Sequence, residues 1–220
     1  MADHRKVFDR ELLTLKQQLL TMGEHVEQAI DKAIKALISQ DLTLADEVII
    51  HDDAINQMRA DIDNMVIQII TQQQPVAKDL RRVIIALKMN ASLERMGDLA
   101  RNIAKISKRL EMTLSDKTVD KLMEMVSIVQ EMVRGILQAY LDENEANAKL
   151  VAIEDDKVDT YYKNYLNYLF SAVDNNVKSA EQATQLAFVG RHLERIGDHV
   201  TNIAELLVYL EEAKNFDLNK

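Results

Sequence analysis

The sequence predicts an all-α protein built as two tandem three-helix bundles related by internal duplication. Three observations lead to this prediction. The 220 residues include only five glycines and one proline, so little interrupts long helices. Alanine, leucine, methionine, glutamate, glutamine and lysine are abundant, and these residues favour helix over sheet. A twelve-residue segment also recurs one hundred residues later, which indicates a duplicated unit.

The repeated segment spans residues 93–104 and 193–204, and eight of its twelve positions are identical. A second pair of segments, 45–56 and 148–159, matches at an offset of 103 residues. The duplication therefore extends beyond one motif. Each half should contain three helices that are joined by short turns and run antiparallel.

The predicted first bundle covers residues 1–112, where apolar side chains recur at helical spacing. We expect helices there over residues 3–38, 42–72 and 76–112. Asp41 should cap the second helix, and Pro75 should lie in the first turn of the third. The third helix is apolar on nearly every side, which is typical of a buried central helix.

The predicted second bundle covers residues 113–220. We expect its helices to run from about 115 to 141, 143 to 173 and 180 to 213. Asp142 with Glu145, and Ser179 with Gln182, have the spacing of capping boxes. These two pairs should therefore begin the second and third helices of this bundle.

Each copy of the repeated segment carries a glutamate and an aspartate four residues apart, at Glu94 and Asp98 and at Glu194 and Asp198. This spacing puts both carboxylates on one helix face, where like charges repel by about 0.2–0.5 kcal/mol. A glycine precedes each aspartate, and within a helix it costs roughly 1 kcal/mol relative to alanine. Both halves carry both costs at the same place. A bound cation, with a closely packed neighbouring backbone, would offset them.

On a helical wheel, the first acidic pair shares a sector with Leu80, Val83 and Leu87. Burial of unpaired carboxylates is unfavourable. We therefore predict that the four carboxylates of the repeated segment bind hard cations through oxygen ligands. The alternative is that each pair is a surface feature in which the glutamate is bridged to a nearby arginine.

The composition argues against several other classes of protein. The net charge of −9 does not fit a nucleic-acid-binding surface, which carries a basic excess. The chain has no cysteine, so it has neither disulfides nor thiolate metal sites. The first residues do not resemble a signal peptide, and no apolar run approaches the length of a membrane span. A cytoplasmic protein without a membrane span is expected.

These motifs resemble those of the PhoU family, the accessory proteins of bacterial phosphate-specific transport. The resemblance covers essentially the whole chain. Its main mark is the sequence Leu-Glu-Arg-hydrophobic-Gly-Asp at 93–98 and 193–198. Further marks are Asp-Leu-Arg at 79–81, Gln74-Pro75, and the Asp-Asp pairs within the second pair of matching segments.

The resemblance implies a regulator of phosphate uptake and phosphate-starvation signalling that is not an enzyme. PhoU-like proteins are tandem three-helix bundles and usually form homodimers. They repress the starvation response by acting as an adaptor between the ATPase subunit of the ABC phosphate transporter and the phosphate-sensing histidine kinase.

The resemblance also implies bound metal. Members of the family hold iron, magnesium, manganese or zinc at paired Glu/Asp-x-x-x-Asp motifs, which the four carboxylates of the repeated segment match. Asp155 and Asp159 match the same pattern on the preceding helix, whereas Asp52 is followed four residues later by the neutral Asn56. For Asp52, Asp155 and Asp159 the alternative is a solvated surface charge.

Two other classes of function remain open. A metal-dependent phosphohydrolase would use the carboxylates as a two-metal site, and a metal-storage bundle would bind many more ions. The sequence contains no general base placed for catalysis, no glycine-rich phosphate loop and no Glu-x-x-His pair of the ferritin type. Because an acidic site repels phosphate, direct phosphate sensing there would require a bridging cation.

Overall fold

The computed structural model describes residues 2–111, 113–173, 177–212 and 218, and within these residues the chain is all-helical, as predicted. The helices are α1 (Ala2–Ser39), α2 (Leu42–Gln73), α3 (Ala77–Ser107), α4 (Asp116–Leu141), α5 (Glu145–Ile153), α6 (Asp155–Ser171) and α7 (Val177–Glu212). None of the described helices is both long enough and apolar enough to cross a membrane.

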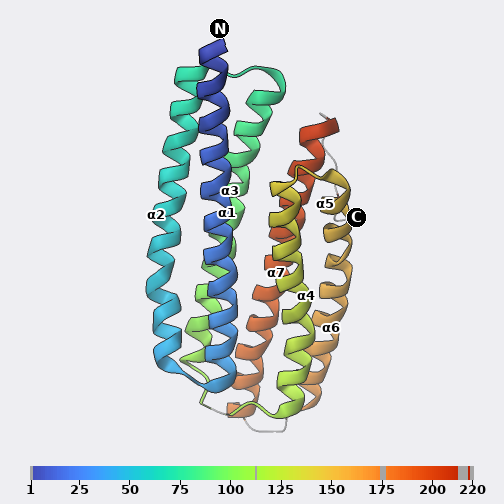
Figure 1. Cartoon of the computed structure of the whole chain (residues 1–220). Helices are drawn as coiled ribbons and strands as arrows, with labels where there is room; N and C mark the ends of the chain where they lie inside the picture. The colour runs from blue at the N-terminus through green and yellow to red at the C-terminus, as the bar shows by residue number, and fades with distance from the viewer. Residues whose placement is uncertain (1, 112, 174–176, 213–217, 219–220) are drawn as a thin grey trace.

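Helices α1 to α3 form one bundle and α4 to α7 form a second, and the two bundles lie side by side (Figure 1). Within each bundle the long helices alternate in direction, as their short connections require. The helices that carry the acidic motifs, α3 and α7, pack against each other as well as against the other helices of their own bundle. These two antiparallel helices therefore join the bundles.

The duplication extends to the loops. Gln40, in the loop after α1, and Glu143, in the loop after α4, occupy equivalent positions. Both have a left-handed backbone conformation, with φ of 54° and 49°. The next residues, Asp41 and Asn144, each donate a backbone N–H to a carbonyl five residues earlier and cap the following helix with a side-chain oxygen. The cap at Asp41 confirms the prediction. The predicted capping box at Asp142 is wrong, because Asn144 occupies the position equivalent to Asp41.

The predicted start of the last helix is also wrong. Helix α7 begins at Val177, so Ser179 lies inside the helix rather than at its cap. Gln182 does not close a capping box, because its side-chain oxygen accepts the backbone N–H of Glu111 at 3.2 Å. This bond ties the start of α7 to the chain segment that follows α3.

Three further boundaries differ from the predictions. Helix α3 ends at Ser107, five residues before the predicted end at residue 112. Helix α3 begins at Ala77, so Pro75 lies in the preceding loop and not in the first helical turn. The helix predicted over 143–173 is divided into α5 and α6 by a break at Glu154. The break directly precedes Asp155, one of the predicted metal ligands, and no corresponding break interrupts α2.

Both bundles have interiors of aliphatic side chains, and α3 buries residues on most of its circumference, as expected for a central helix. The bundles also meet directly where α1 approaches α4. Gly23 of α1 packs on Leu137 of α4 so closely that a Cβ atom at position 23 would overlap the leucine side chain. A larger residue at position 23 would therefore require the side chain of Leu137 to move.

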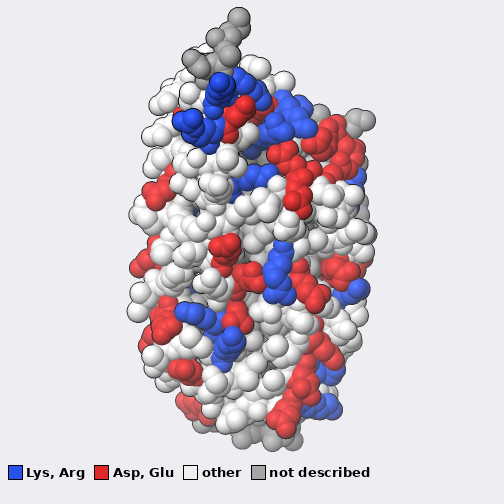
Figure 2. Space-filling view, viewed as in Figure 1, with Lys and Arg blue, Asp and Glu red and all other residues white. Residues whose placement is uncertain are grey.

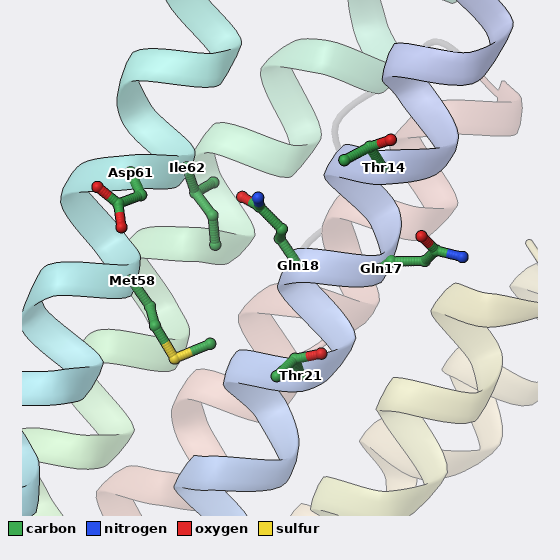
Figure 3. A pocket seen from close by; sticks show the side chains of 7 residues that line it. All are labelled: Thr14, Gln17, Gln18, Thr21, Met58, Asp61 and Ile62. Carbon is green, nitrogen blue, oxygen red and sulfur yellow. The ribbon is translucent and has the colours of Figure 1, made fainter.

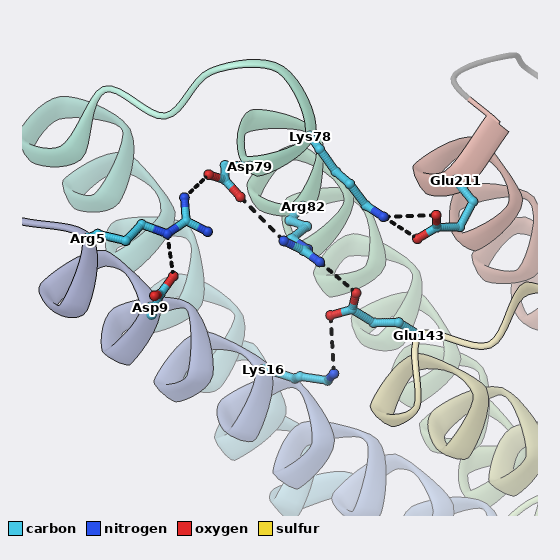
Figure 4. A network of polar contacts seen from close by, with 8 residues as sticks. All are labelled: Arg5, Asp9, Lys16, Lys78, Asp79, Arg82, Glu143 and Glu211. Carbon is cyan, nitrogen blue, oxygen red and sulfur yellow. Dashed lines mark hydrogen bonds and ion pairs between the residues drawn. The ribbon is translucent and has the colours of Figure 1, made fainter. Parts of the chain in front are cut away.

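Acidic and basic side chains are interspersed over the face seen in Figure 2, and basic side chains gather toward the end that holds the α2–α3 loop. At this end a network of ion pairs links the bundles (Figure 4). Glu143, in the α4–α5 loop, accepts from Arg82 at 2.9 Å and lies 3.6 Å from Lys16. Lys78 of α3 contacts Glu211 of α7 at 2.6 Å. The second bundle is therefore held to both α1 and α3.

We predict that Glu143→Gln lowers the free energy of unfolding by about 1 kcal/mol, because it weakens two partly exposed ion pairs of about 0.2–1 kcal/mol each. Thermal unfolding should show Tm lowered by about 2–4 °C, and high salt should reduce the difference. Glu124→Gln is the control, because it affects only the pair with Lys121 within α4. Equal shifts in both variants would show that the pairs between bundles add nothing.

Candidate metal centre

In the first half, Arg101 joins two predicted ligands from different helices. Asp52 projects from α2 and is 3% exposed, whereas Asp98 and Arg101 lie on α3. Arg101 Nη1 lies 2.6 Å from Asp52 Oδ2, and Arg101 Nη2 lies 2.9 Å from Asp98 Oδ1. Burial raises the pKa of Asp52, and the charge of Arg101 opposes this shift.

The third predicted ligand of this half, Glu94, also has an arginine partner. It is buried, and Arg59 Nη1 of α2 lies 2.8 Å from Glu94 Oε1. Arg95 Nη1 lies 2.9 Å from Asp98 Oδ2. The arginine pairing considered as the alternative is therefore present in this half. Metal binding by Asp52, Glu94 and Asp98 stays a prediction, and an ion there would have to displace arginines.

The second half lacks two of these arginines. Alignment of the two copies places Tyr162 opposite Arg59 and Thr201 opposite Arg101, and it places the carboxylate of Asp159 where the first half has an amide. The second half therefore contains four acidic side chains with less positive charge beside them. These are the remaining predicted ligands: Asp155, Asp159, Glu194 and Asp198.

Asp155 lies against the glycine of the second motif. A Cβ atom at Gly197 would be only 2.5 Å from Asp155 Oδ1, so the glycine allows this approach. The closely packed neighbour expected at this glycine is therefore a side chain rather than a backbone. Asp155 Oδ1 and Glu194 Oε2 are buried without a hydrogen-bond partner, although Arg191 pairs with the other oxygen of Glu194.

Burial and repulsion by neighbouring carboxylates raise the pKa values of Asp155, Glu194 and Asp198. Burial is the largest cause for Asp155, whose pKa rises to about 7, and the charges of Asp198, Asp159 and Glu194 add to the shift. Burial also raises the pKa values of Glu194 and Asp198. Raised values for carboxyl groups mean that the ionised form is destabilised, and a cation would relieve this.

The donors in the second half fit a hard cation, because they are carboxylate oxygens and two of those oxygens are buried without partners. Within the described residues, no three aspartate, glutamate or histidine side chains already converge on one centre. An ion would therefore be bound through side-chain rotations that turn Asp155, Asp159 and Glu194 toward a common point.

The sequence interpretation did not identify Arg59 and Arg101 as partners of the acids. The contact between Arg101 and Asp52 joins residues 49 positions apart, so only the packing of α2 on α3 reveals it. A signal was nevertheless present in the duplication. Both arginines are replaced in the second copy while the motif acids are kept, so the acids of the second half have fewer arginine partners, with Arg191 pairing only with Glu194.

Two other features lie between α1 and α2. His25 Nδ1 and His51 Nε2 are 2.8 Å apart, so the two imidazoles bond to each other, a contact the sequence did not predict. A hollow of about 270 Å³ lies farther along the same helices (Figure 3). It is lined by Thr14, Gln17, Gln18, Thr21, Met58, Asp61 and Ile62. Asp61 is its one charged residue, so the hollow suits neither a multivalent cation nor an anion.

The chain is similar to proteins of one family over nearly its whole length. The PhoU family model, described as PhoU domain, matches residues 19–107 and again 122–207. A Clostridium acetobutylicum protein named phosphate-specific transport system accessory protein PhoU homolog is 39% identical over 216 residues, which cover 98% of this chain and 99% of that protein.

Solved structures agree with this similarity. The crystal structure of the phosphate transport system regulatory protein PhoU from Streptococcus pneumoniae has a TM-score of 0.88 at 32% identity, and the match covers 96% of this chain and 99% of that one. PhoU from Pseudomonas aeruginosa has a TM-score of 0.89 at 36% identity, with 94% and 100% covered. The tandem-bundle architecture is therefore shared with experimentally determined structures.

We predict that Asp155→Asn becomes more stable relative to the wild type as pH rises from 5 to 8 in the presence of a chelator. The folded pKa of about 7 lies above the unfolded value of 3.8, so the stability linked to this proton is complete below 3.8 and is lost as pH rises to 7. The relative gain should be about 2 kcal/mol, less than the full shift at 1.36 kcal/mol per pKa unit, because Asp155 is partly exposed.

The measurement is chemical denaturation of both proteins at several pH values in EDTA. The histidines are common to both proteins, so their contributions largely cancel in the difference. A stability difference that does not change between pH 5 and pH 8 would contradict the raised pKa of Asp155.

Proposed function

The chain belongs to the PhoU family, and from this premise we propose that it is an accessory regulator that restrains phosphate uptake and the phosphate-starvation response when phosphate is plentiful. One observation carries the proposal: similarity over 98% of the chain to a protein named as an accessory protein of phosphate-specific transport. The family model matches both halves, so the duplicated architecture is retained.

The regulator would act as an adaptor on the cytoplasmic side of the membrane, where it would contact the ATPase subunit of the phosphate transporter and the phosphate-sensing histidine kinase. The names of the relatives, accessory and regulatory, support contact with other proteins rather than catalysis. Apolar side chains on the outer helices supply a surface for such contacts and for a homodimer. Ile50 of α2 and its equivalent Ile153 of α5 are 70% and 61% exposed.

The second half would bind a divalent or trivalent cation, such as iron, manganese, magnesium or zinc, through Asp155, Asp159, Glu194 and Asp198. The two buried carboxylate oxygens without partners and the raised pKa values support this assignment. The ion would supply the positive charge that Arg59 and Arg101 supply in the first half. The sequence-predicted ligands of the first half would bind metal only after these arginines had moved.

The phosphohydrolase alternative is not favoured by any observation. A two-metal hydrolase needs its ions within one shared site, together with a water and a bound substrate. In the described residues the acids of the two halves belong to separate bundles, and those of the first half are paired with arginine.

We predict that Mn²⁺ raises the Tm of the chelator-treated protein by about 5–10 °C, because ligand at one hundred times its Kd stabilises by about 2.7 kcal/mol. Asp155→Asn and Glu194→Gln should lose most of this shift. Thr201→Arg should lose it as well, because the new guanidinium would occupy the position that Arg101 has in the first half. Asp156→Asn is the matched control, because Asp156 is adjacent to Asp155 but exposed.

If Mn²⁺ raises the Tm of Asp155→Asn, Glu194→Gln and Thr201→Arg as much as that of the wild type, the proposed metal site in the second half is wrong. The same series with Mg²⁺, Zn²⁺ and Fe²⁺ would rank the ions by the shift that each produces.

We predict that deletion of the gene raises expression from phosphate-regulated promoters in high-phosphate medium, because the proposed repressor is lost. The wild-type gene supplied in trans should restore repression, as should the Asp156→Asn gene. Promoter activity is read with a reporter in high and low phosphate. Repression that persists unchanged in the deletion strain would exclude the regulatory role.

A further inference from the structure

The groove between α3 and α7 carries positive charge, although the whole chain has a net charge of −9. Two hollows lie along this groove, and the duplication relates them to each other. The lower hollow lies where α3 ends and α7 begins. The upper hollow lies on the same two helices, at the other end of the groove. Comparison of the two shows which one differs chemically.

The lower hollow has a volume of about 180 Å³. It is lined by Asn102, Lys105, Ile106, Arg109, Gln185, Phe188 and His192. The lining includes two cations and no carboxylate, and within the described residues neither cation forms an ion pair. Nδ1 of His192 is buried and has no hydrogen-bond partner. The lower hollow therefore contains uncompensated positive charge and an unused polar atom.

The upper hollow, of about 320 Å³, is partly compensated. Its lysine and arginine, Lys88 and Arg95, face a lining that includes Glu205, and Arg95 is already paired with Asp98. Glu205 occupies the position that Lys105 has in the lower hollow, and it accepts the backbone N–H of Leu218 at 2.8 Å. The duplicated positions have diverged in charge, and the lower hollow is the more positive of the two, because its lining has two cations and no carboxylate.

The side chains of the lower hollow suit a small tetrahedral oxyanion. An arginine guanidinium can donate two parallel hydrogen bonds to a phosphate, and a lysine adds a point charge. The amide nitrogens of Asn102 and Gln185 can donate hydrogen bonds to phosphate oxygens, and their amide oxygens can accept a hydrogen bond from a protonated phosphate oxygen. Ile106 and Phe188 add apolar surface to the lining.

We propose that the lower hollow binds inorganic phosphate directly, without a bridging metal ion. This inference rests on the proposed regulatory function, and it identifies inorganic phosphate as the ligand to which the regulator responds. Lys105 and Arg109 come from α3 and the residues just beyond it, whereas Gln185 and His192 come from α7. A phosphate bound between them would link the two bundles, so phosphate would stabilise the docked arrangement of α3 against α7.

The test is calorimetric titration of inorganic phosphate into the full chain in the presence of EDTA. Arg109→Gln and Lys105→Gln should each weaken binding about tenfold. Lys108→Gln removes the same charge one residue from Arg109, but Lys108 pairs with Asp46 and does not line the hollow, so its affinity should stay at the wild-type value. Circular dichroism checks that each variant is folded.

Two further titrations test the chemistry. Sulfate should bind more weakly than phosphate, because it has no O–H group that could donate a hydrogen bond to an amide oxygen. Phenyl phosphate should bind more weakly if the hollow takes free phosphate, whereas tighter binding of this ester would identify a phosphoryl group on another molecule as the ligand and would overturn the proposal.

The proposal is also overturned if Arg109→Gln binds phosphate as the wild type does, if sulfate binds equally well, or if binding appears only when a metal ion is added. These outcomes are independent of the regulatory role. If the deletion strain loses repression but Arg109→Gln binds phosphate with wild-type affinity, the phosphate site is contradicted and the regulatory function is supported. Site-specific phosphate binding combined with unchanged repression in the deletion strain would do the reverse.

Discussion

Compensation of buried negative charge is the constraint on which this structure depends. In each half, two neighbouring helices bring carboxylates together at the edge of an apolar interior, where breaking a buried ion pair costs about 3–5 kcal/mol. In the first half, arginines of the same chain supply the compensating charge, with Arg101 bridging Asp52 and Asp98. In the second half, Asp155 Oδ1 and Glu194 Oε2 are buried without partners and Arg59 and Arg101 have no counterparts, so a proton or the proposed cation would supply the missing positive charge.

The two halves have diverged in opposite directions at their two charged sites. At the carboxylates, two arginines have been replaced and one amide has become an acid, whereas Arg191 stands where the first half has Ala91, so the second half is more negative by two unit charges. At the groove between α3 and α7, Lys105 and Arg109 correspond to Glu205 and Tyr209, so the lower hollow is the more positive of the pair. Because the backbone is duplicated, these differences mark sites that packing alone does not explain.

The helical architecture could be predicted because so few glycines and prolines interrupt the chain, and because duplication repeats every local signal. The buried position of the motif glutamates also followed, from the apolar sector that surrounds the first pair. The arginine bridge could not be predicted, since Arg101 and Asp52 meet only through the packing of α2 on α3. The prediction that Asp142 caps the helix was wrong. The alignment of the two halves, which places Asn144 opposite Asp41, is a stronger indication of the cap than a short capping pattern.

The junction between the bundles is the place where a small ligand can have a measurable effect. Inside each bundle, separation of the helices would expose apolar surface at about 25 cal/mol per Å², a total no single ion matches. Across the junction, ion pairs such as Arg82–Glu143 and Lys78–Glu211 contribute about 1 kcal/mol or less each. An anion held between α3 and α7 acts on that same scale of energy. Helix α7 also carries Glu194 and Asp198, two of the proposed metal ligands, so the proposed cation and the proposed phosphate would both act on this one helix.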